Sequence, residues 1–267
     1  MSNESITKTF SVATCLCVVC AIIVSLSDVS LKGMQQQNKA LDKQINILRA
    51  AGLVDPGAKV SAQEAEKLFA NAQIAVVDLQ SGTIVDDVDP ADVEKDKDNF
   101  VTLSKEDDVA QIKTAPKRVV AYLFKDQTGA LQTAVLPIVG TGLWSTLHGF
   151  LALNGDLTTV AHIVFYDHGE TPGLGGEISN PVWTAKWEGK TAVNEQGEPV
   201  IRVVKGAATS DSEIDGISGA TLTGAGVTRT VTFWLGDNGF GPFLNNQRGD
   251  SVPSKGDATP DSNDVEN

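Results

Sequence analysis

The globular part of this sequence lacks cysteine. All three cysteines of the 267-residue chain, Cys15, Cys17 and Cys20, lie in one short apolar stretch near the N-terminus. A disulfide framework is therefore excluded for the rest of the chain in any redox compartment. Cys17 and Cys20 form a C-x-x-C pair inside the apolar stretch, without two further ligands nearby. We interpret the pair as polarizable packing groups and not as a metal or redox site.

The chain also has little positive charge. It contains 21 Lys and Arg residues against 34 Asp and Glu residues, which gives a net charge of −13. Binding to nucleic acid requires clustered basic side chains that neutralise phosphates, so a nucleic-acid partner is excluded. An acidic balance is typical of a soluble domain that stays away from anionic lipid.

Several motifs that carry enzyme chemistry are missing. Only three histidines occur, with neither an H-E-x-x-H motif nor a Cys/His cluster, so we expect no protein-bound metal. The G-x-S-x-G elbow of hydrolases is absent. Neither a Walker A motif nor a helix-opening G-x-G-x-x-G after a strand is present. The sequence therefore predicts no NADH site and no catalytic residues of its own.

One long apolar run is present near the N-terminus. Residues 10–27 read FSVATCLCVVCAIIVSLS and include no charged side chain. A helix of this length spans about 27 Å, the lower limit for crossing a bilayer. A cleaved signal peptide is the alternative, but no clean A-x-A site follows. A lipoprotein needs a small residue before its cysteine, and Thr14 before Cys15 fits weakly. We predict an uncleaved transmembrane helix over 10–27, with residues 1–9 in the cytoplasm and the domain outside.

Residues 28–115 are predicted to form a juxtamembrane helix and the lead-in of a soluble domain. Apolar residues recur at helical spacing over 31–53, which favours an amphipathic helix. Ser61 and Glu64 form a capping box, which predicts a short helix through Phe69.

Strand-like runs dominate the middle of the chain. Turn sequences at 126–129 and 154–156 separate some of them, and consecutive hairpins indicate an antiparallel sheet. The predicted strands cover residues 74–79, 118–125, 130–139, 146–154, 158–166 and 200–205. A helical pattern follows over 221–235. The fold class is therefore α+β: one N-terminal transmembrane helix, then an antiparallel-sheet domain with flanking helices. Residues 247–267 have almost no apolar side chains and predict a disordered acidic tail.

A cluster of small residues lies where a loop meets the helix over 221–235. Residues 215–221 read D-G-I-S-G-A-T. Backbone N–H groups at a helix N-terminus favour a negatively charged group, and Gly219 and Ala220 leave Thr221 open to a bulky one. The segment therefore fits a phosphate site. An ordinary N-cap, with the hydroxyl of Ser218 or Thr221 capping the helix, is the alternative.

A second unusual segment follows the strand predicted over 158–166. Residues 168–175 read H-G-E-T-P-G-L-G, and three glycines with one proline predict a rigid, tightly turned loop. The loop combines polar with apolar side chains, namely His168, Glu170, Thr171, Pro172 and Leu174. Such a mixture fits a flat heterocycle that has a polar edge and apolar faces. A long surface turn is the alternative.

Both segments resemble parts of the FMN-binding domain family. D-G-I-S-G-A-T is similar to the signature in which the last threonine of S-G-A-T receives FMN through a phosphoester bond. H-G-E-T-P-G-L-G resembles the loop that contacts the flavin ring. The resemblance covers most of residues 5–246 and implies an FMN-binding domain over 116–246.

The family has two close branches. One is the C subunit of bacterial Na+-translocating NADH:quinone reductases, and the other is the G subunit of Rnf-type ion-translocating ferredoxin:NAD+ reductases. Residues 234–244, WLGDNGFGPFL, resemble the C-terminal end of the quinone reductase protein, as does the order of anchor, lead-in and flavin domain. The Rnf-type protein stays open as an alternative. So does a membrane-tethered binding module without a redox role, in which S-G-A-T only caps a helix.

The resemblance to the quinone reductase branch implies an electron relay with covalently bound FMN. Electrons would pass from NADH toward ubiquinone in a six-subunit complex, coupled to Na+ export. A flavin relay needs a fixed cofactor and no catalytic side chain. The implied partners are the other subunits, a flavin transferase that attaches FMN, and the membrane. The implied location is the bacterial inner membrane, with a single span and the flavin domain on the periplasmic side.

The resemblance also implies roles around the flavin. Thr221 would be the phosphoester tether. Leu174 and Trp144 would pack near the ring, although Trp144 could equally be a core residue, and Thr171 and Glu170 would lie at the polar edge of the ring. The other implied cofactor-binding residues lie in the two motifs: Gly173, Asp215, Ser218, Gly219 and Ala220. Of these, Asp215 and Ser218 would serve recognition by the flavin transferase or shape the loop.

Overall fold

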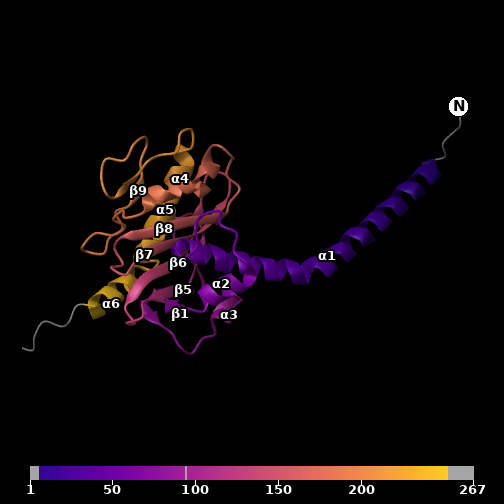
Figure 1. Ribbon diagram of the computed structural model, residues 1–267. Coiled ribbons are helices and arrows are strands. Elements are labelled where there is room, and N and C mark those ends of the chain that lie inside the picture. The colour runs from indigo at the N-terminus through magenta and orange to yellow at the C-terminus, as the bar shows by residue number, and fades with distance from the viewer. Residues whose placement is uncertain (1–5, 94, 252–267) are drawn as a thin grey trace, which may run out of the picture. The chain divides into compact units, whose positions relative to one another are not determined.

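The chain divides into two units, Met1–Ile45 and Asn46–Asn267. The computed structural model describes residues 6–93 and 95–251 (Figure 1). Residues 1–5, part of the predicted cytoplasmic terminus, lie outside the described residues.

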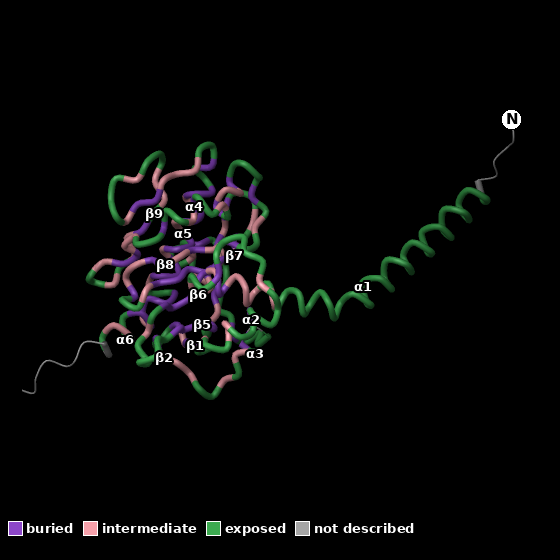
Figure 2. The backbone as a smooth tube through the Cα atoms, in the orientation of Figure 1, coloured by how far each residue is buried: buried purple, intermediate pink, exposed green. Residues whose placement is uncertain are grey.

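The described residues of the first unit, 6–45, belong to helix α1 (Ile6–Ala50). This helix is long and apolar enough to cross a membrane, and its apolar window is exposed, as the green tube in Figure 2 shows. The sequence predicts separate helices over 10–27 and 31–53. The structure has one continuous helix instead, because residues 28–30 include no proline or glycine that would end it.

Helix α1 ends, within the second unit, in a glycine turn. The N–H groups of Gly52 and Leu53 donate to the carbonyls of Arg49 and Leu48 over 3.0 and 2.9 Å. Gly52 has a φ of 73°, so the turn is a Schellman cap. A Cβ at this position would also lie 2.6 Å from Nε2 of His162, which leaves no space for a side chain.

Six antiparallel strands form the main sheet, in the order β2-β1-β5-β6-β7-β8. They are β1 (Ala72–Asp78), β2 (Thr83–Ile84), β5 (Arg118–Lys125), β6 (Leu131–Thr141), β7 (Thr146–Asn154) and β8 (Val160–Asp167). Strands β5 and β7 match the predicted strands 118–125 and 146–154 at both ends. The predicted antiparallel α+β architecture is thus confirmed.

The remaining elements in the middle of the chain are short. They are α2 (Ala62–Phe69), α3 (Pro90–Val93), η1 (Lys97–Asn99), β3 (Phe100–Thr102), β4 (Thr114–Pro116), η2 (Gly175–Ser179), α4 (Pro181–Thr184), η3 (Ala185–Trp187), β9 (Arg202–Val203) and β10 (Glu213–Ile214). Ser61 caps α2 by accepting a hydrogen bond from the N–H of Glu64, as predicted. The strand predicted over 200–205 is wrong in length and place, since β9 is two residues long and pairs in parallel with β10 outside the main sheet.

Both faces of the sheet are covered. Alternating residues of β6, such as Leu136 and Ile138, point into the main hydrophobic core with helices α5 (Thr221–Leu235) and α6 (Gly241–Ser251). On the opposite face, Tyr122 of β5 packs between Phe69 of α2 and Phe150 of β7, with ring centroids 5.8 and 6.3 Å apart. Figure 2 shows the buried backbone concentrated in the strands.

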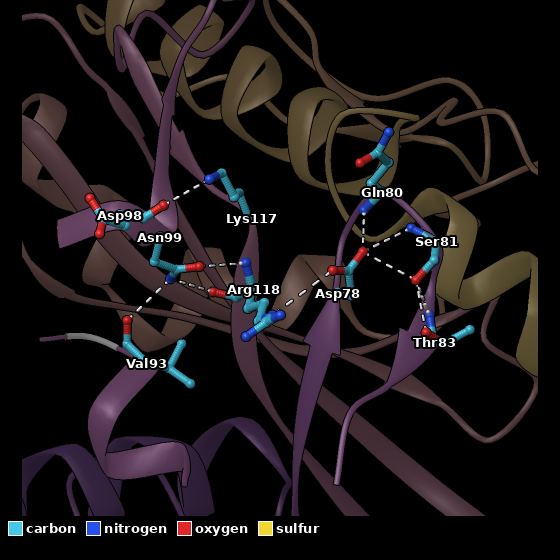
Figure 3. Close-up of polar contacts among 9 residues, drawn as sticks. All are labelled: Asp78, Gln80, Ser81, Thr83, Val93, Asp98, Asn99, Lys117 and Arg118. Atoms are coloured by element: carbon cyan, nitrogen blue, oxygen red, sulfur yellow. Dashed lines mark hydrogen bonds and ion pairs between the residues drawn. The ribbon is translucent and has the colours of Figure 1, made fainter. Parts of the chain in front are cut away.

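Buried Asn99 ties the segment before residue 115 to the sheet (Figure 3). Its Nδ2 donates to the carbonyls of Val93 and Arg118 over 3.1 and 2.9 Å, and its Oδ1 accepts from the N–H of Arg118. Asp78 closes the β1–β2 turn by accepting from the N–H and the hydroxyl of Ser81. Residues predicted as the lead-in (28–115) and as the FMN-binding domain (116–246) therefore contribute strands to one sheet.

Helix α6 continues beyond the end expected for the domain. The sequence predicts disorder from residue 247, whereas α6 is helical through Ser251. The side chain of Asn246, a residue of this helix, donates hydrogen bonds to the carbonyls of Ser81 and Gly82. These bonds attach the helix to the β1–β2 turn. Residues 252–267 of the predicted acidic tail lie outside the described residues.

Candidate functional site

Helix α5 begins without a side-chain cap. Its N-cap residue is Ala220, with φ −128° and ψ 38°, and the first backbone bond runs from the N–H of Gly224 to the carbonyl of Ala220 over 3.0 Å. Within the described part of the chain, the N–H groups of residues 221–223 meet no acceptor. The alternative in which Ser218 or Thr221 caps the helix is therefore wrong. The free N–H groups and the helix dipole favour a bound anion.

The two threonines in the first turn of α5 have opposite environments. Thr221 is exposed, whereas Thr223 is buried at 1% exposure and donates its hydroxyl to Oε2 of Glu170 over 2.6 Å. Gly219, which precedes the helix, has a φ of 72°. This left-handed conformation favours glycine, and a Cβ there would lie 2.9 Å from Cδ2 of Leu174. Of these two threonines, only Thr221 presents its hydroxyl to an incoming group.

A cavity of about 380 Å³ lies beside Thr221. It is lined by residues 203–206, 216–221 and 224–225. Lys205 is its cationic side chain, and Lys205 forms no ion pair within the described residues. Val203 and Ile217 contribute apolar side chains to the wall of the cavity. The cavity thus combines a positive charge and a helix N-terminus with apolar surface, a combination that fits a phosphate joined to an organic group.

Strand β9 forms the cavity wall because it packs on the first half of α5. The N–H of Val203 donates to Oγ1 of Thr228 over 2.9 Å, and a Cβ at Gly224 would lie 3.1 Å from Cγ1 of Val203. Sequence reasoning missed Val203, Lys205 and Ile217 as site residues. No local motif marks Val203 and Lys205, since the parallel pairing of β9 with β10 brings them to the S-G-A-T segment.

The loop over 168–175 follows β8 and meets the S-G-A-T segment at Leu174. The N–H groups of Leu174 and Gly176 both donate to the carbonyl of Thr171, over 3.1 and 2.9 Å, and Gly173 has a φ of 75°. The loop is therefore tightly turned, as the sequence predicts. Leu174 is 44% exposed and lies against the Gly219 backbone.

Glu170, which the sequence predicts at the polar edge of a ring, is held by hydrogen bonds within the protein. Its side chain is buried, and Oε1 accepts hydrogen bonds from the N–H groups of Leu143, Trp144 and Ser145 over 3.1, 2.9 and 3.2 Å. Burial by itself would raise the pKa of Glu170, but the Thr223 hydroxyl and these N–H groups together lower it below its ordinary value. The carboxylate faces the protein interior.

Exposed apolar side chains lie close to this hydrogen-bonded group. Trp144 and Leu143, in the turn between β6 and β7, are 72% and 43% exposed. Leu222, between the two threonines of α5, is 61% exposed. The core position considered for Trp144 is therefore wrong. Large apolar side chains that lie together at a protein surface are typical of a place where a ligand or partner binds.

Asp215, the first residue of the motif, shapes the preceding loop. Its carboxylate accepts from the N–H of Ala208 over 2.7 Å and pairs with Nζ of Lys186 at 2.6 Å. These two groups, in that order, hold the pKa of Asp215 below its ordinary value. Its carbonyl accepts from the indole N–H of Trp183. Ser218, in contrast, lies at the cavity.

Comparison with known proteins places the site within one family. The model of the FMN-binding domain family matches residues 142–236, which include both motifs and the cavity. The chain is 44% identical over 255 residues to the C subunit of the Na+-translocating NADH-quinone reductase of Yersinia pestis, covering 92% of this chain and 95% of that protein. It is 45% identical over 258 residues to the same subunit of Pseudomonas aeruginosa, covering 92% and 98%.

Solved structures agree with the sequence matches. The crystal structure of Shewanella oneidensis NqrC has a TM-score of 0.69 and 32% sequence identity, covering 78% of this chain and 97% of that chain. The structure of the corresponding reductase subunit from Parabacteroides distasonis has a TM-score of 0.58 and 26% identity, covering 81% and 96%.

Proposed function

The chain belongs to the NqrC family, the C subunits of Na+-translocating NADH-quinone reductases, and we propose that it holds FMN on Thr221 through a phosphoester bond. The observation that supports this most directly is the exposed Thr221 hydroxyl at an uncapped helix N-terminus, beside a cavity that holds Lys205. A phosphodiester at Thr221 retains one negative charge. The N–H groups of α5 and the ammonium of Lys205 would stabilise that charge.

The residues around Thr221 fit the other parts of FMN as well. Leu174 and Trp144 present exposed apolar surface that would pack near the flavin ring, and Thr171 with Gly173 forms the exposed turn beside Leu174. Val203 and Ile217 offer apolar contacts inside the cavity. Planar, mostly apolar ligands are bound by surfaces of this kind, with a few polar groups that fix their orientation.

Bound FMN supplies reversible electron transfer, and we propose that this protein is an electron relay. The chain itself would hold the cofactor, orient it and limit its contact with water, without a catalytic side chain. Electrons would pass through it toward quinone, and the complex would couple the flow to Na+ export. The other subunits of the reductase and a flavin transferase are the proposed partners.

The proposed location is the bacterial inner membrane, with one span and the flavin domain on the periplasmic side. Helix α1 supports a membrane anchor because its apolar window is long enough to cross a bilayer and is exposed. The Rnf-type protein is the weaker candidate, since the curated relatives that match along 92% of this chain belong to Na+-translocating NADH-quinone reductases. A module without flavin is disfavoured by the FMN-binding domain match.

The mass of the full-length chain tests the attachment. The chain would be expressed with and without a flavin transferase, purified in detergent and measured intact. We expect the two masses to differ by one covalently bound FMN, and we expect peptide mapping to place the added mass on Thr221. Equal masses, with FAD and the transferase both shown to be present and active on another substrate, would contradict the proposal.

Reduction experiments test the relay. The purified full-length flavoprotein should be bleached by dithionite and should not be bleached by NADH at a useful rate, because the sequence has no dinucleotide fingerprint. Rapid NADH oxidation by the isolated protein would show that it is a self-contained dehydrogenase.

A further inference from the structure

We propose that Glu170 is a positioning residue of the flavin site, which holds the turn over 143–145 and the first turn of α5 in one fixed arrangement. The proposal rests on the proposed function, since it assigns Glu170 a role toward the cofactor tethered at Thr221. Neither the two motifs nor the family match assigns a role to the interior position of this carboxylate.

The carboxylate of Glu170 joins its own loop, residues 168–175, to the turn over 143–145 and to helix α5. The N–H groups of three consecutive residues, Leu143, Trp144 and Ser145, converge on Oε1, and the Leu143 N–H also lies 3.2 Å from Oε2. The hydroxyl of Thr223 completes the set from helix α5 over 2.6 Å. Three backbone donors and one hydroxyl thus satisfy a charged group that is only 4% exposed.

Two glycines leave space for this carboxylate. A Cβ at Gly142 would lie 2.5 Å from Oε1 of Glu170. A Cβ at Gly175 would lie 2.8 Å from Oε2 of Glu170 and 2.5 Å from Oγ1 of Thr223. Real Cβ atoms do not approach oxygen so closely, so any side chain at either glycine would displace the carboxylate. The sequence is therefore adapted to the carboxylate on both sides.

Further hydrogen bonds hold the loop over 168–175 close to the Glu170 carboxylate. Oγ of Ser145 accepts from the N–H of Gly169 over 2.6 Å. The N–H of Glu170 donates to Nδ1 of His168 over 3.3 Å, and Nε2 of the same ring lies 3.3 Å from Oγ of Ser179. With Nδ1 as the acceptor, Nε2 of a neutral ring is the donor to Ser179.

These hydrogen bonds hold the backbone of the turn and the first turn of α5, while neighbouring side chains stay exposed and available to contact a ligand. The backbone of Trp144 is bound to Glu170 while its indole is 72% exposed. Thr223 is engaged with Glu170 while Thr221, two residues earlier, is exposed. Glu170 therefore holds the backbone of the turn and the first turn of the attachment helix while the side chains of Trp144 and Thr221 stay exposed. Preorganised groups with locked backbones hold a ligand in one geometry.

Two substitutions separate the charge of Glu170 from its shape. In Glu170→Gln, the amide oxygen can accept from the three N–H groups, and the amide nitrogen can donate to the Thr223 hydroxyl, so the geometry is retained without the charge. Glu170→Ala removes both. Asp156→Asn is the matched control, because Asp156 also accepts from two backbone N–H groups and a threonine hydroxyl, in the turn at the opposite end of β7.

The first measurement is hydrogen exchange of the full-length chain in detergent, expressed without transferase. We expect the amides of residues 143–145 to exchange about tenfold or more faster in Glu170→Ala than in wild type. Glu170→Gln should retain most of the protection, and Asp156→Asn should leave these amides unchanged. Wild-type exchange in Glu170→Ala would overturn the proposal.

The second measurement is the flavin midpoint potential of the flavinylated chain. Glu170→Gln should shift it to more positive values, because removal of a nearby negative charge favours electron uptake, and Asp156→Asn should not. An unchanged potential in both Glu170 variants, together with lost amide protection, would make Glu170 merely structural and would also overturn the proposal. Absence of covalent flavin in the wild type would contradict the proposed function and, with it, the role of Glu170 toward the cofactor. The exchange experiment would still show whether Glu170 holds the turn over 143–145.

Discussion

Thr223 donates its hydroxyl to the buried carboxylate of Glu170 over 2.6 Å, although 53 positions separate the two residues in the sequence. The bond joins the first turn of α5 to the loop that follows β8. It also removes Thr223 from the surface, so that Thr221 is the accessible threonine of this helical turn.

This difference predicts opposite effects for two alanine substitutions. Thr221→Ala should abolish covalent flavin fluorescence in a denaturing gel, because Thr221 is the exposed threonine in the first turn of the helix. Thr223→Ala should retain most of the fluorescence but lower the free energy of unfolding by about 1–3 kcal/mol, because Glu170 loses a buried hydrogen-bond donor. Flavin retained in Thr221→Ala and lost in Thr223→Ala would reverse the assignment.

Leu174→Ala should leave the flavin attached and shift its midpoint potential. The phosphoester does not involve Leu174, whereas its exposed side chain beside Gly219 would cover part of the ring. Potentiometric titration of the flavinylated full-length chain measures the effect. Val182→Ala is the control, because Val182 is also exposed but belongs to helix α4. If the Leu174 variant keeps the wild-type potential and spectrum, Leu174 does not contact the ring.

Lys205→Gln should slow flavin attachment by roughly three- to tenfold, because the cavity loses its cation for the phosphate. The initial rate of flavin incorporation by the transferase, followed by in-gel fluorescence, measures this. Lys105→Gln is the control, since Lys105 is exposed and does not line the cavity. Equal rates for wild type and both variants would exclude a role of Lys205 in attachment.

The lowered pKa of Glu213 predicts that the folded protein loses stability in acid. The N–H of Thr209, then its hydroxyl, then Arg202 lower the pKa of Glu213 from 4.5 to about 2. Because the pKa is lower in the folded protein, the stabilisation is fully present above pH 4.5 and is lost as the pH falls toward 2. Glu213→Gln should therefore lower the urea midpoint of the full-length chain at about pH 7.

The difference between wild type and Glu213→Gln should shrink steadily between about pH 4.5 and 2. Glu195→Gln, an exposed position, should change the midpoint little at either end of this range. A gap between Glu213→Gln and wild type that stays constant over the range would show that the carboxylate charge is not the cause.

The proposed membrane topology predicts the side on which a C-terminal reporter is active. A reporter that works only outside the cytoplasm, fused after Asn267, should be active, and residues 10–27 should be retained in the mature protein. Activity of a matched cytoplasmic reporter at the same position would place the domain on the other side. N-terminal sequencing that starts beyond residue 27 would show cleavage.

Elements whose signals are local can be predicted from the amino-acid pattern alone. A run of 18 uncharged residues specifies an apolar helix, strand-like apolar runs bounded by turn residues specify β5 and β7, and the Ser61 cap specifies the start of α2. The two glycine-rich motifs were also readable, because their residue types and order are specific to FMN-binding domains. Helix α5 was predicted over its full length.

Which groups of the site lie together depends on the three-dimensional fold. Lys205 reaches the cavity because β9 pairs with β10 and packs on α5, a contact that no local pattern encodes. Glu170 looks like any polar loop residue in sequence, yet packing turns its carboxylate inward, where three N–H groups and Thr223 satisfy it. Local signals depend on neighbours within a few positions. Burial and hydrogen bonding depend on segments that only folding brings together.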